Sequence, residues 1–491
     1  MIRPILTNGK FIQAKSNTTI PIHNPATMAP LDSIPACGTA DIDGAVAAAR
    51  AAQPVWWRLP GLDKAELLHA IAARIRTQQK PIATLMTQET GKPLIESIDC
   101  VQWVTEAFDY FAEVARSSLG LTVPPVAEHQ VNFVRKEPYG VVACIAPFNF
   151  PLLLMVWKVA PAIAAGNTVV CKPPHQNPLA NLLMAECYDV LPPGVINVVT
   201  GAGETGKLLT EHPGVDMIAF TGSTAVGRQI AAAAGAQLKK VNLELGGIDP
   251  LIVFADADLD VAVPGAAWAR LLNAGQVCTS SKRIYVVESI ADAFTRRIVD
   301  HVKTLKVGDP MDAKTDMGPL ISADAVDKLE RQVATAIKEG AQCVLGGKRF
   351  QPNGLAGHFF QPTVLTNVRH GGIATSEELF GPVVSIFRAK DAADAIRLAN
   401  DSEYGLGASI YTKSLEIAMK AMENIKAGSF WINDPLADNN AAPFGGMRHS
   451  GIGRELGAEG LDAFREPKHV HLDYLQERKH DWFPYAARKI P

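Results

Sequence analysis

Residues 140–172 read GVVACIAPFNFPLLLMVWKVAPAIAAGNTVVCK, in which two short apolar runs enclose a segment long enough for a helix. The runs lie at 141–145 and 168–171, and similar runs follow at 196–199 and 217–220. Continuously apolar strands that alternate with helices are typical of a parallel sheet covered on both faces. This part of the chain therefore predicts a doubly wound α/β domain.

A second series of apolar runs begins near Pro250 and predicts a second α/β domain with a parallel sheet. Its members are 251–254, 283–287 and 383–387, again with helical segments between them. The chain has 491 residues, too many for one ordinary core, so two or three domains that share a cleft are expected. The first third reads as a helical scaffold, with strong helix formers at 42–53 and 64–76.

The composition is that of a globular enzyme and disfavours several other classes of protein. Hydrophobic residues make up 47% and charged residues 20% of the chain, which leaves little room for disorder. A formal net charge of -3 offers no basic field to nucleic acid. The uncharged run 140–157 contains Pro147, Asn149 and Pro151, which indicate a buried turn rather than a membrane span. No secretory signal follows Met1, so we expect a cytoplasmic protein without membrane attachment.

Cysteines are scattered singly and fit neither a disulfide framework nor a metal-ligand spacing, so no metal is expected. Most should be small buried hydrophobic residues. Cys278 differs, because the segment 273–281 around it is polar and rich in small residues. An accessible thiol in such a segment can act as a nucleophile, although a single cysteine is more often structural.

Two further polar residues stand in apolar surroundings and are candidates for chemistry. Glu244 lies between Leu243 and Leu245, where burial would raise its pKa toward that of a general base. The alternative is a solvated loop glutamate. Asn149 lies among aromatic residues and prolines, where its amide could stabilise an oxyanion. A turn-forming asparagine is the alternative.

Two glycine-rich turns follow predicted strands and could present backbone N–H groups to phosphate. The segment 201–207 matches the dinucleotide fingerprint and the first seven positions of a P-loop, but Leu208 replaces the hydroxyl that would bind magnesium. A nucleoside triphosphatase is therefore disfavoured. In the second turn, 220–227, Ser223 could cap a helix and contact a pyrophosphate, or serve as a plain helix cap.

Taken together, the residues resemble the aldehyde dehydrogenase superfamily over essentially the whole chain. The resemblance rests on motifs that follow one another in the expected order: Pro147-Phe148-Asn149-Phe150-Pro151, Cys171-Lys172-Pro173, Phe220-Thr221-Gly222-Ser223, Leu243-Glu244-Leu245-Gly246-Gly247, Gly275-Gln276-Val277-Cys278, Glu377-Glu378-Leu379-Phe380-Gly381-Pro382 and Pro443-Phe444-Gly445-Gly446. It implies a Rossmann-like cofactor domain, a catalytic domain and a small element that joins subunits.

The resemblance also implies the chemistry. Cys278 attacks the aldehyde carbon, while the Asn149 side chain and the Cys278 backbone N–H hold the oxyanion. Hydride then leaves for the nicotinamide, and Glu244 activates the water that hydrolyses the resulting thioester. Lys158 and Glu455 match a proton path to solvent.

The implied cofactor is NAD or NADP. The resemblance assigns Lys172 to the adenosine ribose, Ser223 to the pyrophosphate, and Glu378 with Phe380 to the nicotinamide ribose and ring. The remaining expected cofactor contacts are His175, Phe148, Gly203, Phe220 and Gly222.

Two positions depart from the family pattern. His175 stands three residues after Lys172, where NAD-preferring relatives usually carry a glutamate that binds both ribose hydroxyls. A glutamate repels a 2′-phosphate, whereas a histidine does not and can pair with it when protonated. The choice between NAD and NADP is therefore open. Ile248-Asp249 follows the double glycine, where relatives more often have lysine or asparagine first.

The substrate is a small aldehyde whose identity the sequence does not give. The resemblance places Phe150, Leu154, Trp157 and Phe444 in the wall of the substrate tunnel. The loop before Phe444 carries the polar residues Asp434, Asp438, Asn439 and Asn440. If they line the tunnel, a hydroxylated or cationic aldehyde is favoured. The alternative is that they face solvent.

By the same resemblance we expect three parts: a cofactor-binding domain of residues 1–120 and 139–247, a catalytic domain of 248–449, and a bridging or oligomerisation element of 121–138 and 465–491. The element implies a homodimer or a homotetramer. Two alternative functions stay open. An acylating relative would pass the acyl group to coenzyme A, but such enzymes typically lack the base at Glu244. A non-catalytic binding protein on this scaffold would be expected to have lost Cys278 or Glu244.

Overall fold

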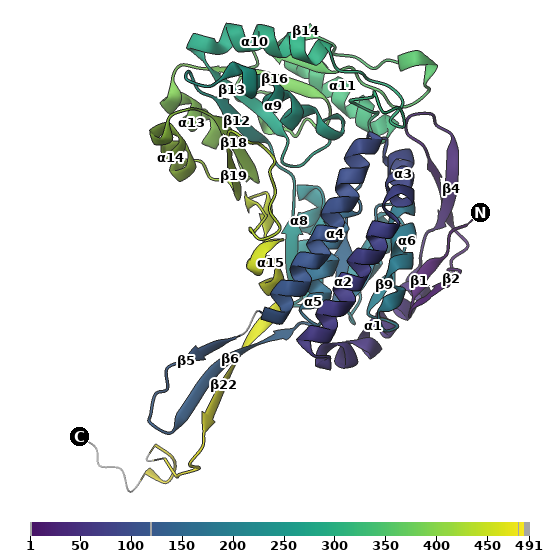
Figure 1. Cartoon of the computed structure of the whole chain (residues 1–491), viewed down its shortest axis with the longest axis vertical. Helices are drawn as coiled ribbons and strands as arrows, with labels where there is room; N and C mark the ends of the chain where they lie inside the picture. The colour runs from purple at the N-terminus through teal and green to yellow at the C-terminus, as the bar shows by residue number, and fades with distance from the viewer. Residues whose placement is uncertain (1, 118–119, 480, 486–491) are drawn as a thin grey trace.

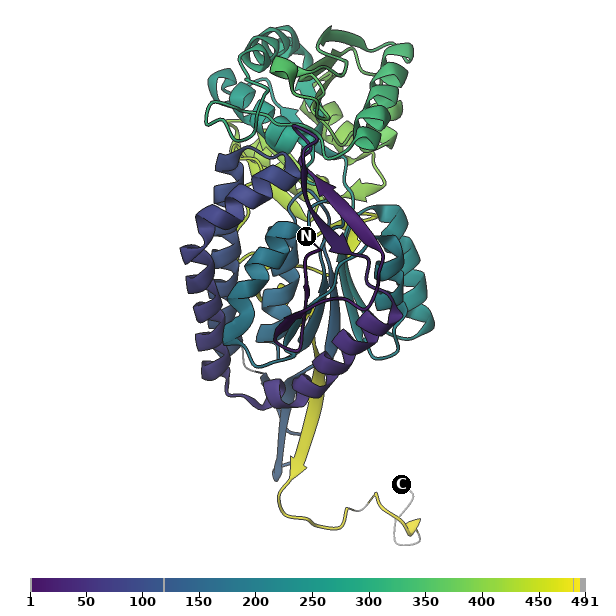
Figure 2. The same ribbon diagram turned by 90° about the vertical axis from the view of Figure 1, so that its right-hand side faces the viewer.

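Two lobes and a projecting arm make up the chain (Figures 1 and 2). The structure is a computed structural model that describes residues 2–117, 120–479 and 481–485. The expected ranges 1–120 and 465–491 therefore fall partly outside the described residues, at 1, 118–119, 480 and 486–491. Each lobe is built on one sheet of mainly parallel strands with helices packed against it, which confirms the predicted α/β class.

The sheet of the first lobe has the strand order β2-β1-β9-β8-β7-β10-β11-β21. Its strands from β9 to β11 run parallel, while β1 and β21 pair antiparallel with the strands at the two ends of this parallel block. The strands are β1 (Ile5–Thr7), β2 (Lys10–Ile12), β7 (Val141–Ile145), β8 (Thr168–Lys172), β9 (Ile196–Val198), β10 (Met217–Thr221), β11 (Lys240–Glu244) and β21 (Gly451–Ile452). The apolar runs of the sequence coincide with β7, β8, β9 and β10, and every residue of these four strands is buried.

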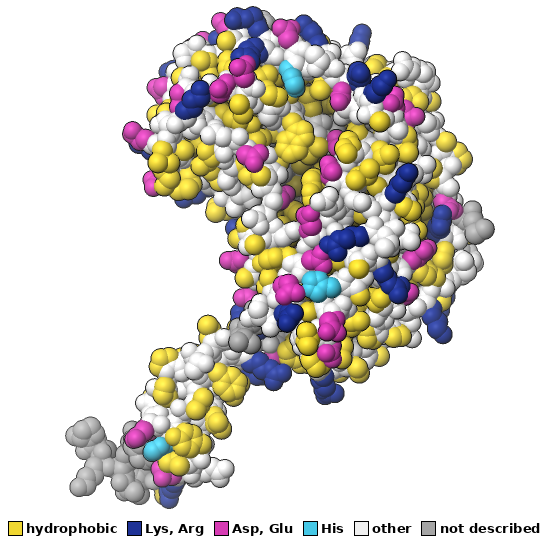
Figure 3. All heavy atoms as spheres, viewed as in Figure 1, with side chains coloured by type: hydrophobic (Ala, Val, Ile, Leu, Met, Phe, Trp, Pro, Cys, Tyr) yellow, Lys and Arg dark blue, Asp and Glu magenta, His cyan; other side chains and the backbone are white. Residues whose placement is uncertain are grey.

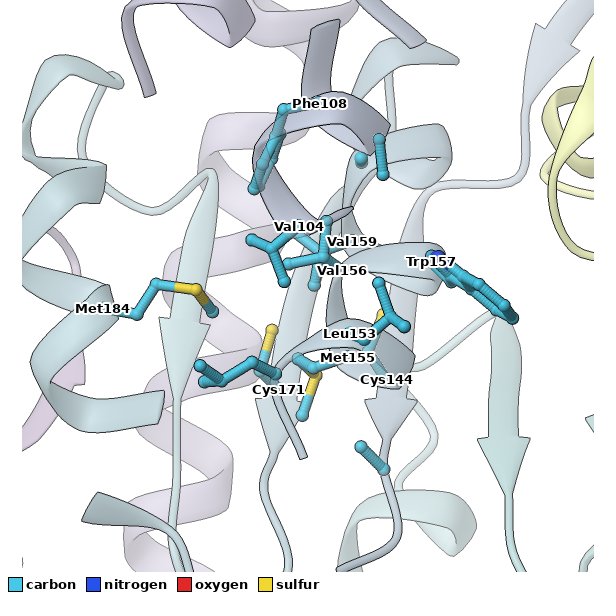
Figure 4. Close-up of a cluster of buried hydrophobic side chains, with 14 of the residues drawn as sticks. Val104, Phe108, Cys144, Leu153, Met155, Val156, Trp157, Val159, Cys171 and Met184 are labelled. Atoms are coloured by element: carbon cyan, nitrogen blue, oxygen red, sulfur yellow. The ribbon is translucent and has the colours of Figure 1, made fainter. Parts of the chain in front are cut away.

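Helices of the first lobe cover this sheet and pack on one another. They are α1 (Thr39–Arg58), α2 (Gly61–Thr77), α3 (Gln79–Thr90), α4 (Leu94–Ser117), α5 (Leu153–Ala164), α6 (Leu179–Met184), η1 (Ala185–Val190), α7 (Gly203–Glu211), α8 (Thr224–Ala236) and α15 (Gly457–Asp462). Figure 4 shows the core between α4, α5 and the sheet, where Val104 and Phe108 meet Val156 and Val159. The buried cysteines of β7 and β8 belong to this core, as expected for small hydrophobic residues.

The helices expected at 42–53 and 64–76 are confirmed as the central parts of α1 and α2. The helical prediction was wrong for residues 5–35, which contain β1, β2, β3 (Thr19–His23) and β4 (Pro30–Pro35). The β3 strand reads Thr19-Ile20-Pro21-Ile22-His23, in which proline and β-branched residues disfavour a helix and pair in an antiparallel ladder with β4.

The sheet of the second lobe has the strand order β14-β15-β16-β13-β12-β18-β19, and only the β14–β15 pairing is antiparallel. The runs at 251–254, 283–287 and 383–387 coincide with β12, β13 and β16. The strands are β12 (Asp249–Val253), β13 (Ser281–Val287), β14 (Gln342–Leu345), β15 (Thr363–Thr366), β16 (Val383–Ala389), β18 (Gly407–Tyr411) and β19 (Ser429–Ile432). The helices are α9 (Leu259–Leu271), η2 (Leu272–Gly275), α10 (Glu288–Lys303), α11 (Ala323–Lys338), η3 (Pro352–Gly354), α12 (Ile373–Ser376), α13 (Ala392–Asn400) and α14 (Leu415–Asn424).

The arm is a three-stranded antiparallel sheet that leaves the first lobe and extends away from both lobes (Figure 1). It contains β5 (Leu121–Val123), β6 (Gln130–Pro138) and β22 (Arg465–Asp473). After β19 the chain leaves the second lobe through β20 (Met447–Arg448), which pairs with β17 (Tyr404–Gly405). It then passes through β21 and α15 on the first lobe and enters the arm a second time as β22. No helix among the described residues is long and apolar enough to cross a membrane.

Candidate active site

Two cavities meet at Cys278, which lines both of them. The larger has a volume of about 830 Å³ and the smaller about 360 Å³. The larger cavity lies at the carboxyl ends of the parallel strands of the first lobe, where doubly wound sheets bind ligands. Every position expected to contact the cofactor lines it: Phe148, Lys172, His175, Gly203, Phe220, Gly222, Ser223, Glu378 and Phe380. Every position expected to contact the substrate lines the smaller cavity: Phe150, Leu154, Trp157, Asp438 and Phe444.

Two helices of the first lobe begin at the larger cavity. Gly203 is the first residue of α7, and Ser223 caps α8 by accepting a hydrogen bond from the Val226 N–H at 3.4 Å. The N-terminus of a helix carries partial positive charge and backbone N–H groups without helical partners. Both helix ends therefore suit the phosphates of a dinucleotide.

Lys172 and His175 lie at the same cavity, just beyond the end of β8. Burial lowers the pKa of Lys172 to about 8. Burial, and then the nearby Lys172 ammonium, lower the pKa of His175 below its usual value. His175 is therefore neutral at neutral pH, and it contributes neither a positive nor a negative charge to the ribose end of the cavity.

A tight turn before Cys278 holds the nucleophile segment in place. Asn273 and Ala274 have positive φ values of 51° and 55°, and Gly275 follows with φ 74°. A side chain at Gly275 would collide with the carbonyl of Gly381, so the glycine is required by both conformation and space. The Asn273 amide donates to the Asn149 carbonyl at 3.0 Å and thereby connects the Cys278 turn to the loop after β7.

The Cys278 thiol faces the cavities but is otherwise enclosed by protein. Burial raises its pKa to about 12, while the Lys282 ammonium acts in the opposite direction. Lys282 is buried and donates to the carbonyls of Val277 at 2.8 Å and Cys278 at 2.6 Å. It also forms an ion pair with Glu378 at 3.1 Å. Lys282 therefore favours the Cys278 thiolate, and it also fixes the loop that carries Cys278 and pairs with Glu378 in the larger cavity.

Asn149 lies in the loop between β7 and α5 and lines the larger cavity together with Cys278. Its backbone carbonyl is fixed by the bond from Asn273, and the side chain is buried. The neighbouring Asn177 amide donates to the Phe148 carbonyl at 2.7 Å, which anchors the same loop from the other side. An amide on a doubly anchored loop beside a thiol is suited to hold a developing oxyanion.

Glu244 is the last residue of β11 and is buried at the junction with β21, where it pairs with Gly451. Burial raises the pKa of its carboxyl group well above the usual value, and the nearby Glu455 carboxylate raises it further. Lys158 is the largest influence in the opposite direction. Glu244 is not among the described residues that line the two cavities, and its carboxylate oxygens lie close to Gly445 and Gly451.

Lys158 and Glu455 form a fully buried ion pair at 2.6 Å. The Lys158 ammonium also donates to the Thr221 hydroxyl at 2.5 Å and to the Leu154 carbonyl at 3.0 Å. Burial raises the pKa of Glu455, while Lys158 opposes this effect. Glu455 and Phe444 exchange backbone hydrogen bonds of 2.7 and 2.6 Å, so the pair is attached directly to the wall of the smaller cavity.

The smaller cavity is lined by both aromatic and acidic side chains. The rings of Trp157 and Phe444 pack with centroids 5.0 Å apart. Of the polar residues in the loop before Phe444, Asp434, Asp438 and Asn440 line the cavity, whereas Asn439 does not. Asp434 and Asp438 are also exposed to solvent, while Asn440 is partly buried.

Comparison with known proteins agrees with this arrangement. The model of the aldehyde dehydrogenase family matches residues 11–470, nearly the whole chain. The chain belongs to the aldehyde dehydrogenase family. It is therefore an enzyme, an oxidoreductase that oxidises an aldehyde with a nicotinamide cofactor.

Several members of the aldehyde dehydrogenase family are similar over their full length. The glutarate-semialdehyde dehydrogenase of Pseudomonas aeruginosa is 40% identical, over 95% of this chain and 96% of the relative. The succinate-semialdehyde dehydrogenase [NADP(+)] of Escherichia coli is also 40% identical over the same shares of both chains. Among solved structures, the betaine aldehyde dehydrogenase of Staphylococcus aureus in complex with NAD+ has a TM-score of 0.95 at 36% identity, covering 98% of this chain and 97% of that one.

Sequence reasoning missed charged residues that hold the site of this aldehyde dehydrogenase together. Besides Lys282, the buried Arg270 guanidinium donates to the carbonyls of Val383 at 2.6 Å and Gly381 at 2.6 Å. It thereby fastens α9 to the segment before β16 that carries Glu378. The sequence does show Arg270 inside an otherwise apolar stretch. A buried charge is stable only when it is paired or hydrogen-bonded, so this position could have indicated a structural role. No group of three or more potential metal ligands occurs among the described residues.

The position of Lys282 gives a first testable prediction. Lys282→Met removes the cation that favours the thiolate, so the pKa of Cys278 should rise. Alkylation of Cys278 by iodoacetamide at a fixed pH should then slow by about tenfold, the effect of one pKa unit. The apparent KM for the cofactor should increase, because Glu378 loses its ion-pair partner.

The measurement needs a Cys343→Ala background, since Cys343 is exposed and would also react. Lys338→Met, on the exposed side of α11, is the matched control. An alkylation profile that does not change with Lys282→Met would exclude this influence on the thiol.

Proposed function

We propose that this aldehyde dehydrogenase converts its substrate to the free acid through a thioester on Cys278, which a water activated by Glu244 hydrolyses. The observation that carries the proposal is the position of Cys278, where a cavity suited to a dinucleotide meets a smaller, aromatic cavity. A thiol at this junction can attack a carbonyl carbon that is held in the smaller cavity while the dinucleotide occupies the larger cavity.

Asn149 and the Cys278 backbone N–H are proposed to hold the oxyanion formed by this attack. The support is that Asn149 and Cys278 line one cavity and that the Asn273 bond ties their two loops together. Donors that are fixed before the reaction stabilise developing charge without reorganisation. The proton of the thiol has to leave as the bond forms, and Lys282 favours the thiolate that results.

Glu244 is proposed to serve as the general base in the second half of the reaction. Its raised pKa makes the carboxylate a stronger base than an ordinary glutamate, which suits a group that takes a proton from water. Because Glu244 lines neither cavity, its side chain is proposed to turn toward the thioester during hydrolysis. The proton that it gains is proposed to pass to the Glu455 carboxylate, which pairs with the Lys158 ammonium at 2.6 Å.

The larger cavity fits NAD or NADP, since its volume of about 830 Å³ is accompanied by two helix N-termini and a buried lysine. When bound, the nicotinamide supplies the acceptor for the hydride. Lys172 and His175 would hold the adenosine ribose, Ser223 the pyrophosphate, and Glu378 with Phe380 the nicotinamide end. We propose that both cofactors are used, because no carboxylate stands at position 175 to repel a 2′-phosphate.

His175→Glu should shift the cofactor preference toward NAD. The new carboxylate would accept hydrogen bonds from the ribose hydroxyls of NAD and repel the 2′-phosphate of NADP. The ratio of kcat/KM for NAD to that for NADP should rise by about tenfold or more, equivalent to about 1.4 kcal/mol. His175→Gln, which is neutral, is the control and should leave the ratio close to its original value. An unchanged ratio with glutamate would mean that the ribose end is recognised elsewhere.

The arm is proposed to join subunits in a homodimer or homotetramer, with residues 121–138 and 465–491 as the bridging element. Leu121, Val131, Phe133 and Leu472 are exposed on its strands, and Figure 3 shows the hydrophobic side chains gathered there. Exposed apolar residues on a strand that projects from the body are typical of a subunit contact. The remaining ranges, 1–120 with 139–247 and 248–449, are proposed as the cofactor and catalytic domains.

A panel of aldehydes assayed with both cofactors tests the proposed function as a whole. The panel should include betaine-type, semialdehyde, aliphatic and aromatic aldehydes, and both NAD(P)H and the released acid should be quantified. Equal amounts of acid and reduced cofactor, without added coenzyme A, are expected. Reduction of the cofactor only in the presence of coenzyme A would overturn the hydrolytic route.

A further inference from the structure

The smaller cavity has a cluster of aromatic side chains in its wall. Phe150, Trp157 and Phe444 are buried, whereas Trp103 on α4 and Trp268 on α9 remain 38% and 47% exposed. Tryptophan rings that are this accessible beside a cavity leave their faces free for a ligand. Aromatic faces attract cations through their negative π surface, and tryptophan does so most strongly.

Carboxylates supply the charge of the same cavity. Glu106 projects from α4, and Asp434 and Asp438 come from the loop after β19. Among the described residues that line the cavity there is no lysine, arginine or histidine. Neither Asp434 nor Asp438 has an ion-pair partner within the described part of the chain. The residues that line the cavity are therefore negative in sum, although the buried Lys92 ammonium lies 3.4 Å from the centroid of the Phe150 ring.

Asp438 lies within electrostatic reach of the nucleophile. It is exposed at the cavity, where its carboxylate is accessible to a ligand. Asp438 also contributes to the raised pKa of Cys278. A positive charge bound beside Asp438 would act in the opposite direction on both groups, since it favours the carboxylate and the thiolate together.

We propose that the preferred substrate of this site is an aldehyde whose far end carries an ammonium or quaternary ammonium group, bound by Asp438 and the tryptophan faces while Cys278 reacts with the carbonyl. This inference rests on the proposed function and adds the substrate class to it. The cation is recognised by two independent features of the cavity, its aromatic faces and its uncompensated carboxylates. Binding of the correct substrate also assists formation of the thiolate that attacks it.

The same wall discriminates against the substrates in the names of several relatives. A semialdehyde such as glutarate or succinate semialdehyde carries a carboxylate, which would be repelled by Glu106, Asp434 and Asp438. Retinaldehyde, named in a relative 41% identical to this chain, is long and apolar and would have to cover these carboxylates without pairing them. Substrate preference can therefore differ from these relatives even at such identity.

The experiment compares aldehydes that differ only in charge. Betaine aldehyde and 3,3-dimethylbutanal have the same shape, with nitrogen replaced by carbon, and 4-(trimethylammonio)butanal and 5,5-dimethylhexanal form a longer pair. For each pair, kcat/KM of the cation is divided by that of the neutral isostere, in the wild-type enzyme and in Asp438→Asn. Differences in aldehyde hydration cancel when the two enzymes are compared. Glu423→Gln, an exposed carboxylate on α14 outside the cavities, is the matched control.

In the wild-type enzyme, we expect the cation to be preferred over its isostere by at least about tenfold for one of the pairs, and succinate semialdehyde to be a poorer substrate than either member. Asp438→Asn should reduce this preference by about tenfold, mainly through KM, while oxidation of the neutral isostere continues. Glu423→Gln should leave it unchanged. Equal use of cation and isostere, or a preference unaffected by Asp438→Asn, would overturn the inference and leave the proposed function intact. Failure to oxidise any aldehyde, charged or neutral, would overturn the proposed function itself.

Discussion

Cys278→Ala is expected to lower aldehyde-dependent formation of NAD(P)H by at least about 10⁴-fold, the scale seen when a covalent nucleophile is removed. The reason is that Cys278 is the only residue at the junction of the two cavities with a nucleophilic thiol among the described residues that line them. Without the covalent adduct, no carbon is positioned to give up its hydride. Binding of the cofactor alone should change by less than about twofold, because the methyl side chain of alanine leaves the phosphate and ribose contacts in place.

The measurement combines the initial rate of NAD(P)H formation with titration of cofactor binding by protein fluorescence. Cys343→Ala is the matched control, since Cys343 is an exposed cysteine on β14, at the edge of the second sheet and away from both cavities. Its activity should equal that of the unmodified protein. Turnover of Cys278→Ala at the original rate would show that the thiol is not the nucleophile.

The central strands could be predicted from the sequence because each is buried on both faces. A run such as Val141–Ile145 has no polar residue at any position, and this composition is required when helices cover both sides of a sheet. The same burial made the loops at the ends of these strands recognisable, since Asn149 and Glu244 are polar residues in apolar surroundings. The motifs therefore located the residues around the cavity without any structure.

Short strands with exposed residues could not be predicted in this way. β2 has three exposed residues, and β21 has two residues that pair with β11 although about 200 positions separate them in the chain. Their conformation is fixed by the neighbouring strand and not by their own composition. β1 was missed although Ile5 and Leu6 are buried, because it has only three residues, and β3 is exposed at three of its five positions.

The contacts of buried charged residues could not be predicted from the sequence either. Lys282 is the second residue of β13, and its ammonium donates to two carbonyls and pairs with Glu378 inside the protein. Trp103 and Glu106 belong to α4, which reads as scaffold but forms part of the smaller cavity. The influence of Lys158 and Glu455 on the pKa of Glu244 was also beyond prediction, because both residues are far from it in the sequence.

Glu244→Gln is expected to leave the first turnover intact and to slow steady-state release of acid by about 100-fold, within the usual range for loss of a general base. Formation of the thioester requires Cys278 and Asn149, neither of which Glu244 contacts in this structure. A rapid burst of about one NAD(P)H per active site should therefore remain, followed by a slow phase. Stopped-flow absorbance at 340 nm separates the two. Loss of the burst would assign Glu244 a role before hydrolysis, and an unchanged slow phase would remove it from hydrolysis.

The pH dependence provides an independent check on the same residue. Burial and Glu455 raise the pKa of Glu244, so its protonated form persists to higher pH than in an ordinary glutamate. Since only the carboxylate can accept a proton from water, hydrolysis by the unmodified enzyme should accelerate as the pH rises through this raised pKa. Glutamine does not titrate, so the slow phase of Glu244→Gln should lose this dependence.

The raised pKa also means that ionisation of Glu244 at high pH lowers the free energy of unfolding, and Glu244→Gln removes that loss. At pH 8 the variant should therefore unfold at a temperature equal to or higher than that of the unmodified enzyme, which separates a lost base from a damaged fold.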